Sequence, residues 1–115
     1  MSKSALKRRA REARTWLLED CFPLWSERGI GAHGLFREAL NLDHQGTDSD
    51  TVRVRVQARQ TYMFAQALRM GWKPDDAAGH IASGIATLTG PARRADGLIG
   101  RTLNTDGSGL VDDTP

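Results

Sequence analysis

The chain has 115 residues, which is enough for one domain at most or for part of one. Its formal net charge of +2 does not indicate a nucleic-acid partner, and it contains no apolar run of about 18 residues that would predict a membrane span. The one cysteine excludes an intrachain disulfide and the basic N-terminus lacks the apolar core of a signal peptide, so we expect a cytoplasmic protein.

Residues 4–28 predict an amphipathic helix with Ser4 as its N-cap. One apolar stripe runs along it and consists of Leu6, Ala10, Ala13, Leu17, Cys21 and Leu24. The basic residues near its start are interpreted as a solvated face. Pro23 predicts a kink or a break, because an interior proline costs about 3 kcal/mol. Trp16 and Trp25 are expected in the core, because aromatic side chains bury large areas.

Glycines interrupt the segment from Gly29 to Thr51, so no helix is predicted there. A short hairpin or loop suits this segment, with a turn at Asp43–Gly46. We expect His33, in the glycine-rich part, to be exposed to solvent, as loop side chains usually are.

The stretch from Val52 to Trp72 carries the most information. Alternating valines and arginines first suggest a strand, but helix-compatible sequence follows, and we place the helix start near Val54. Apolar residues then cover almost the whole circumference, which is typical of a helix buried on most sides. Steps of four or three residues align one polar stripe, made of Arg55, Arg59, Tyr62, Gln66 and Arg69. We interpret this polar stripe as the wall of a pocket, and a solvent face with salt bridges is the alternative. Arg69, near the helix end, is assigned to the solvent face, because a cation there complements the helix dipole.

A further helix is predicted from Pro74, which suits a first helical position and is followed by two aspartates that favour a helix N-terminus. Its apolar stripe consists of Ala78, Ile81, Ile85 and Leu88. Gly79 and Gly84 are expected to weaken this helix, and His80 is expected on its exposed side. The sequence from Gly90 to Pro115 is predicted to be loop-like.

Residues 34–51 match residues 97–114 at a constant offset of 63 residues, with eight identities in eighteen positions. Each unit runs from a glycine-rich hairpin to a buried helix, a turn and an amphipathic helix. Alternating buried and amphipathic helices predict two concentric layers, in a toroid that closes after about six such units. The chain holds about one and a half units, so residues 1–115 are expected to form the N-terminal part of a single, incomplete toroid.

Three segments carry a resemblance to a known family: Trp16–Trp25 (WLLEDCFPLW), Gly34–Leu40 (GLFREAL) and, most specifically, Arg55–Ala65 (RVQARQTYMFA). Together with the ending Asp106–Thr114, they resemble the N-terminal part of the N-acylglucosamine 2-epimerase family. The fold implied by this resemblance is an all-α (α/α)6 barrel, of which this chain would supply about three helices with short hairpin loops.

The resemblance implies isomerase chemistry at C2 of a sugar or sugar phosphate, either epimerisation or aldose–ketose exchange through an enediol. Arg59 matches the family's catalytic arginine, which helps to hold the sugar oxygens. Arg55 and Tyr62 lie about one turn to either side of it and are expected to bind substrate. Phe36, which stands in the segment matching the family's Gly-Gly-Phe motif, is expected to bind substrate as well.

The family's two proton-transferring histidines match none of the histidines here, which are His33, His44 and His80. The chain alone is therefore expected to be inactive. No metal-ligand spacing and no phosphate-cradling loop is present, so no cofactor is expected. Homodimer formation is left open for a full-length protein.

Two other classes of function stay open. A different (α/α)6 carbohydrate-active enzyme, such as a glycosidase, would need two acids either about 5 Å or about 6.5–9.5 Å apart. Glu38, Asp112 and Asp113 are the candidates. A non-enzymatic helical interaction module would use its apolar inner helix to bind a partner. Translation of the coding DNA beyond Pro115 would separate the classes, because further 63-residue units with inward histidines would favour the isomerase.

Overall fold

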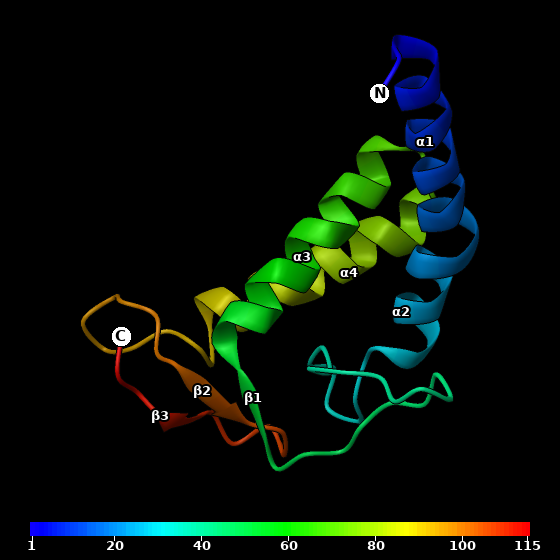
Figure 1. Cartoon of the computed structure of the whole chain (residues 1–115). Coiled ribbons are helices and arrows are strands. Elements are labelled where there is room, and N and C mark those ends of the chain that lie inside the picture. Colours follow the sequence, from blue (N-terminus) through cyan, green and yellow to red (C-terminus); the bar gives the residue numbers. More distant parts are fainter.

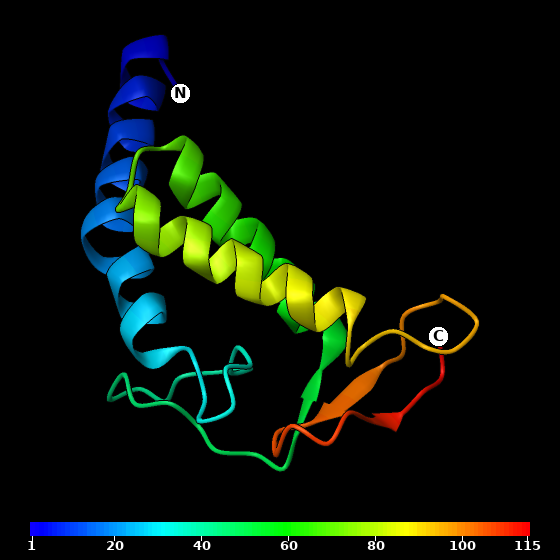
Figure 2. The ribbon, with the colours of Figure 1, turned by 180° about the vertical axis from the view of Figure 1, so that it is seen from behind.

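The computed structural model describes residues 1–115 and is mostly helical, with one small sheet (Figure 1). In chain order the elements are α1 (Lys3–Trp16), the π-helical turn η1 (Leu17–Cys21), α2 (Phe22–Arg28), β1 (Thr51–Arg53), α3 (Val54–Arg69), α4 (Pro74–Thr89), β2 (Thr102–Asn104) and β3 (Leu110–Asp112). The elements α1, η1 and α2 form one continuous rod beside the antiparallel pair α3 and α4 (Figure 1, Figure 2). The predicted helices are therefore confirmed, as is the helix start near Val54.

The rod begins and accommodates its proline differently from the prediction. Ser2, not Ser4, is the N-cap, and its Oγ accepts a hydrogen bond from the Ala5 N–H at 3.1 Å. The irregularity predicted at Pro23 takes the form of η1, after which the Phe22 N–H donates to the carbonyl five residues back. A π-helical turn inserts a residue into the helix and is one of the usual ways to interrupt its hydrogen bonding. Pro23 is then the second residue of α2.

The N-terminal half of the rod has little tertiary contact. No residue of α1 is buried, and Leu6 from the predicted stripe is 60% exposed. Trp16 is 56% exposed, so its expected place in the core is wrong, whereas Trp25 packs against the core as expected. Figure 1 shows that α1 extends past the end of the α3–α4 pair.

Small residues determine how α4 packs on α3. Gly84 is buried, and a Cβ atom at this position would overlap the Thr61 side chain of α3. The buried face of α4 carries Ala77 and Thr87 as well, whereas Ile85 from the predicted apolar stripe is 50% exposed. The predicted stripe is right for Ile81 and Leu88, which pack against the two core clusters, and wrong for Ala78 and Ile85. The glycine lets the two backbones approach closely and so shifts the face that packs.

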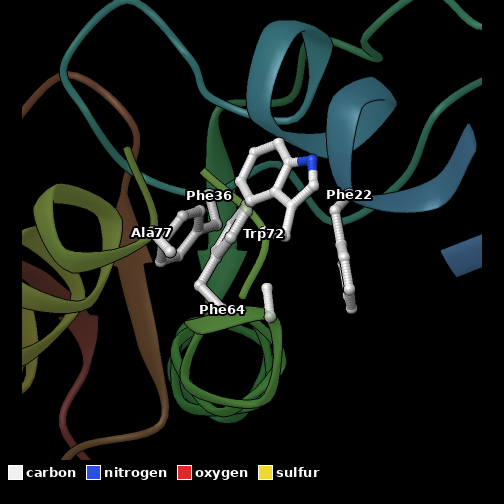
Figure 3. Close-up of a cluster of buried hydrophobic side chains, with 6 residues drawn as sticks. Phe22, Phe36, Phe64, Trp72 and Ala77 are labelled. Carbon is white, nitrogen blue, oxygen red and sulfur yellow. The ribbon is translucent and has the colours of Figure 1, made fainter. Parts of the chain in front are cut away.

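Aromatic residues from several segments meet in the main core cluster, which consists of Phe22, Phe36, Phe64, Ala67, Trp72 and Ala77 (Figure 3). The rings of Phe36 and Phe64 stack with centroids 5.7 Å apart, and those of Phe22 and Trp72 lie 5.9 Å apart. Such pairs contribute about 0.5–1.5 kcal/mol beyond the area they bury. They fasten the first hairpin segment and α2 to the α3–α4 pair. A second cluster joins the sheet to α3 and contains Val52, Val54, Ala92 and Leu103.

His80 lies at the edge of the main core cluster, so the prediction that it is exposed is wrong. Its ring centroid is 4.5 Å from that of Phe64, and its Nε2 shares a hydrogen bond of 2.8 Å with the Ser26 Oγ of α2. Burial lowers the pKa of His80 below its ordinary value, and the charge of Asp76 opposes this shift only in part. The cause of its position is the packing at Gly84, which turns this face of α4 inward.

The two hairpin segments have the same backbone structure at the 63-residue offset. The bridge between Ile30 and Phe36 returns as the bridge between Arg93 and Ile99. Three backbone hydrogen bonds recur in the same way, joining residues 31 to 35, 34 to 31 and 37 to 29 in the first unit and 94 to 98, 97 to 94 and 100 to 92 in the second. The sequence repeat is therefore also a structural repeat.

The sheet docks the second hairpin beside the first unit. Its strand order is β1-β2-β3 with antiparallel pairs, and Val52 lies opposite Leu103. The Thr105 N–H donates to the carbonyl of Asp50 at 2.9 Å, just before β1. The prediction of a loop-like segment after Gly90 missed β2 and β3, because strands of three residues are too short to show alternation.

The chain is more open than a compact domain of its size. Its radius of gyration is 16.0 Å, against about 13 Å expected for this length. Its accessible surface of 7388 Å² exceeds that of a compact monomer of this mass by roughly 1,200 Å². The helix α3 is covered on one side, by α4 and the main core cluster. The expectation that it is buried on most sides is thus wrong within this chain.

Candidate functional site

The polar stripe lies along the open side of α3. Arg55, Arg59, Tyr62 and Arg69 are exposed, with Tyr62 at 66%, and Gln66 is half-buried. The buried residues Phe64 and Ala67 of α3 project from the opposite side of the helix. None of the five polar side chains makes a hydrogen bond or an ion pair within the chain. The stripe is therefore an unpaired polar face, without the salt bridges of the alternative interpretation.

A hollow of about 710 Å³ opens at the start of α3, next to the polar stripe. Its lining residues are Arg53, Val54, Arg55, Ala58, Leu88, Ile99, Gly100, Arg101 and Pro115. Arg55 belongs to both the stripe and the hollow. The second hairpin closes one side, because the Val54 N–H donates to the Arg101 carbonyl at 2.8 Å. Of the polar stripe that was predicted to form a pocket wall, only Arg55, in the first turn of α3, lines a concave surface.

The hollow has a positive lining. Three arginines line it, and no Asp or Glu lines it or stands in the first turn of α3. Glu38 is the nearby counter-charge, since it accepts hydrogen bonds from the Arg53 N–H and, at 3.0 Å, from the Arg53 Nε. Burial alone would raise the pKa of Glu38, but these hydrogen bonds and the charges of Arg53 and Arg55 lower it below its ordinary value. Glu38 is thus an ionised partner of Arg53.

Arg53 and Arg101 were missed as site residues. Arg53 was seen only as part of a valine–arginine alternation, and Arg101 lies in a segment predicted to be a loop. The repeat holds a signal for Arg101, because the 63-residue offset pairs it with Glu38. The second hairpin therefore brings a positive charge to a position where the first brings a negative one.

Phe36 occupies a structural position. Its side chain is 2% exposed and stacks on Phe64, so its ring has no free face for a sugar in this chain. Its backbone is clamped by the fully buried Gln57 of α3: the Phe36 N–H donates to Gln57 Oε1 at 2.9 Å, and Gln57 Nε2 donates to the Phe36 carbonyl at 2.7 Å. We therefore leave Phe36 out of the candidate site. Gln57 was missed because it lies off the polar stripe.

The histidines stand apart from the hollow at α3. His33 borders a second hollow of about 410 Å³, between the first hairpin and the turn that contains Asp106. His44 is exposed in a hairpin turn, and His80 packs on the core. No group of three or more His, Cys, Asp or Glu side chains is placed to hold a metal ion. None of the helices has the length and apolar character needed to cross a membrane.

The acids suggested for a glycosidase do not form a pair suited to that chemistry. A glycosidase needs one carboxyl group with a raised pKa to act as the general acid. Hydrogen bonds from Thr114 lower the pKa of Asp112, and the pKa of Glu38 is lowered as described above. None of the three candidates, Glu38, Asp112 and Asp113, lines the hollow at α3. The site therefore gives no support to this alternative.

An outer rod, an inner helix, an outer helix and a recurring hairpin define a segment of an (α/α)6 barrel. The profile of the N-acylglucosamine 2-epimerase (GlcNAc 2-epimerase) family matches residues 34–114, and the chain belongs to this family. It is 35% identical over 104 residues to a mannose-6-phosphate isomerase of Rhizobium meliloti (strain 1021). The aligned region covers 90% of this chain and 26% of that protein.

A solved structure supports the same fold. Cellobiose 2-epimerase from Spirochaeta thermophila DSM 6192 superposes with a TM-score of 0.72 at 22% identity, over 90% of this chain and 26% of that one. The expected fold, part of an (α/α)6 barrel, is thereby confirmed. The chain spans about a quarter of the length of either relative.

Proposed function

We propose that the chain supplies one wall of the sugar site of an isomerase that acts at C2, by epimerisation or by aldose–ketose exchange through an enediol. The main support for this proposal is the position of Arg59. Its side chain is exposed and unpaired on the open side of α3, and the chain belongs to an epimerase family. The substrates we propose are a hexose or its phosphate, such as mannose, mannose 6-phosphate or an N-acylmannosamine. Cytoplasmic location and homodimer formation of a full-length protein belong to the same proposal.

The role of Arg59 follows from its chemistry. A base removes the proton next to the carbonyl, and negative charge develops on O1 or O2 of the sugar. A guanidinium group stays protonated at any working pH, so Arg59 acts as a fixed donor and not as the base. Its parallel N–H groups suit two neighbouring oxygens, and donors already in place stabilise developing charge without reorganising.

Arg55 and Tyr62 extend this wall on either side. Both side chains lie on the same exposed face of α3, about one turn from Arg59. The Tyr62 hydroxyl can donate to and accept from sugar hydroxyls, and its ring offers an apolar surface. Arg55 connects the wall to the hollow.

The proton-transfer groups are not part of this wall. Neither His33, His44 nor His80 lines the hollow at α3 or belongs to the polar stripe. We therefore propose that the 115-residue chain has no turnover of its own and needs partners that supply a base.

A chimera tests the proposal. The chain replaces the matching quarter of the Rhizobium relative, and turnover of mannose, mannose 6-phosphate and N-acetylmannosamine is measured. We expect turnover in the chimera, a loss of about 10²–10³-fold in kcat for Arg59→Ala, and a change within about twofold for the control Arg69→Ala. Full kcat in the Arg59→Ala chimera, or turnover by the isolated chain, would contradict the proposal.

A helical interaction module is the second candidate. It is favoured by the surface excess, which is near the area that a stable protein interface buries. Sedimentation velocity of the isolated chain at tens of micromolar should then show association through the open side of α3. A clean monomer would count against this candidate.

A further inference from the structure

The hollow at the start of α3 concentrates positive charge in an unusual place. Arg53 is the N-cap of α3 and Arg55 lies in its first turn, at the end where the helix dipole is itself positive. Arg101 faces the same hollow from the second hairpin. Helix N-termini usually carry acidic residues, because these complement the dipole, and α3 has none in its first turn.

The neighbouring carboxylates leave part of this charge uncompensated. Glu38 is held by Arg53 through its N–H and its Nε. Asp112 lies near enough to Arg101 for that charge to contribute to its lowered pKa, after the larger effect of hydrogen bonds from Thr114. The charge of Arg55 also contributes to the lowered pKa of Glu38, but Arg55 makes no ion pair and its guanidinium makes no hydrogen bond within the chain. The guanidinium group of Arg55 is therefore free to pair with a bound anion.

The hollow combines apolar walls with arginines that solvent can reach. Val54 and Leu88 are buried or half-buried, and Ile99 forms part of the lining. The arginines themselves are exposed, so an anion reaches them directly from solvent. Guanidinium groups bind phosphate through paired, charge-assisted hydrogen bonds.

We propose that this hollow is an anion subsite that takes the phosphate of a sugar phosphate substrate, with Arg55 and Arg101 as its ligands. This inference rests on the proposed sugar isomerase function. Arg55 and Arg59 are separated by one helical turn, about 6 Å along the axis, a span that resembles the one between the reacting end of a hexose and a phosphate at its other end. The phosphate then lies in the hollow while the sugar carbons lie beside Arg59 and Tyr62.

The first experiment uses the 115-residue chain and isothermal titration calorimetry with inorganic phosphate, mannose 6-phosphate and mannose. We expect the two phosphates to bind and to compete, and mannose to bind at least tenfold more weakly. The double variant R55Q/R101Q should lose at least tenfold in affinity for both phosphates while its circular dichroism spectrum is retained. The control R69Q, in the last turn of the same helix, should bind as the wild type does.

Three results of this titration would each overturn the phosphate subsite. An equal loss of phosphate affinity in R69Q would show attraction to net charge alone and overturn the subsite. Absence of phosphate binding to the wild-type chain would overturn it as well, as would unchanged affinity in R55Q/R101Q.

The second experiment separates a sugar phosphate from free phosphate and uses the chimera described above. If the subsite binds the phosphate of a sugar phosphate, R55Q/R101Q should raise the KM for mannose 6-phosphate. This rise should be at least tenfold larger than the rise in the KM for mannose. Equal changes in both KM values would overturn the sugar phosphate assignment. A chimera that turns over no sugar, with phosphate still bound by the 115-residue chain, would instead count against the proposed function.

Discussion

The clamp between Gln57 and Phe36 offers the sharpest test of how the fold is held together. Gln57 is fully buried on α3, and its amide satisfies both the N–H and the carbonyl of Phe36 in the first hairpin segment. The substitution Gln57→Leu keeps a similar volume and a similar helix propensity. It removes both partners of the Phe36 backbone without opening a large cavity.

The expected magnitude follows from the two hydrogen bonds. A buried donor or acceptor left without a partner costs about 1–3 kcal/mol, so the two Phe36 groups together cost about 2–6 kcal/mol. The apolar leucine recovers part of this by burial, so the free energy of unfolding should fall by about 2–4 kcal/mol. This is a large share of the about 5–15 kcal/mol by which domains are stable.

Urea unfolding followed by tryptophan fluorescence and by far-ultraviolet circular dichroism measures this loss. The matched control is Gln60→Leu, the same change on the same helix at a half-buried residue whose side chain makes no hydrogen bond. Its effect should stay within about 0.5 kcal/mol. If Gln57→Leu costs no more than Gln60→Leu, the clamp does not hold the hairpin on α3 and the reasoning is refuted.

Two further predictions concern α4. Because burial lowers the pKa of His80 in the folded chain, the unfolded chain binds the proton more readily, so the free energy of unfolding is greatest above about pH 6.5 and falls as the pH decreases below it. Urea midpoints measured between about pH 5 and 7.5 should show this fall in the wild type and in the exposed control His44→Gln, but not in His80→Gln. If the urea midpoint of His80→Gln depends on pH as that of the wild type does, His80 is not the cause of the fall. Gly84→Ala should destabilise by about 1–3 kcal/mol because its Cβ overlaps a side chain of α3. Gly79→Ala, with open space around it, should stabilise by about 0.5–1 kcal/mol, and thermal melts in which both variants shift in the same direction would argue against the close approach.

Local and repeated signals in the sequence predicted most of the architecture. The start of α3 near Val54 was predictable because a short alternation gives way to a long helix-compatible stretch. The 63-residue repeat was predictable because hairpins need glycines and turn residues at fixed positions, and the recurring bridges show the same geometry. The disturbance ahead of Pro23 was predictable from the missing N–H, although its form as a π-helical turn was not.

The packing of α4 could not be read from hydrophobicity. The packed face of a helix is predicted from its large apolar residues, such as Ile85, and glycine contributes little to that prediction. In the structure Gly84 decides the packing, because only a residue without a side chain lets Thr61 lie against the α4 backbone. His80 lies one helical turn before Gly84 on the same face of α4, and its ring packs beside Phe64.

The candidate site was predicted in part, for a related reason. The polar stripe depends only on helical spacing, so Arg55, Arg59 and Tyr62 were placed on one face correctly. The hollow depends on the docking of the second hairpin, through the sheet and the Val54–Arg101 hydrogen bond. Such contacts between distant segments leave no local pattern, so Arg101 was missed.

These contacts give the first turn of α3 its importance. The first hairpin reaches it through Glu38 and the Gln57 clamp, and the second reaches it through Arg101. One hairpin thus brings a carboxylate and the other a guanidinium to the helix end that carries Arg55. Because both hairpins fix this turn, the positions of Arg55 and Arg59 follow from hairpin docking as well as from the helix. The two sides of α3 are therefore linked. Its buried side binds the hairpins, and the hairpins place Glu38 and Arg101 beside Arg55 on its open side.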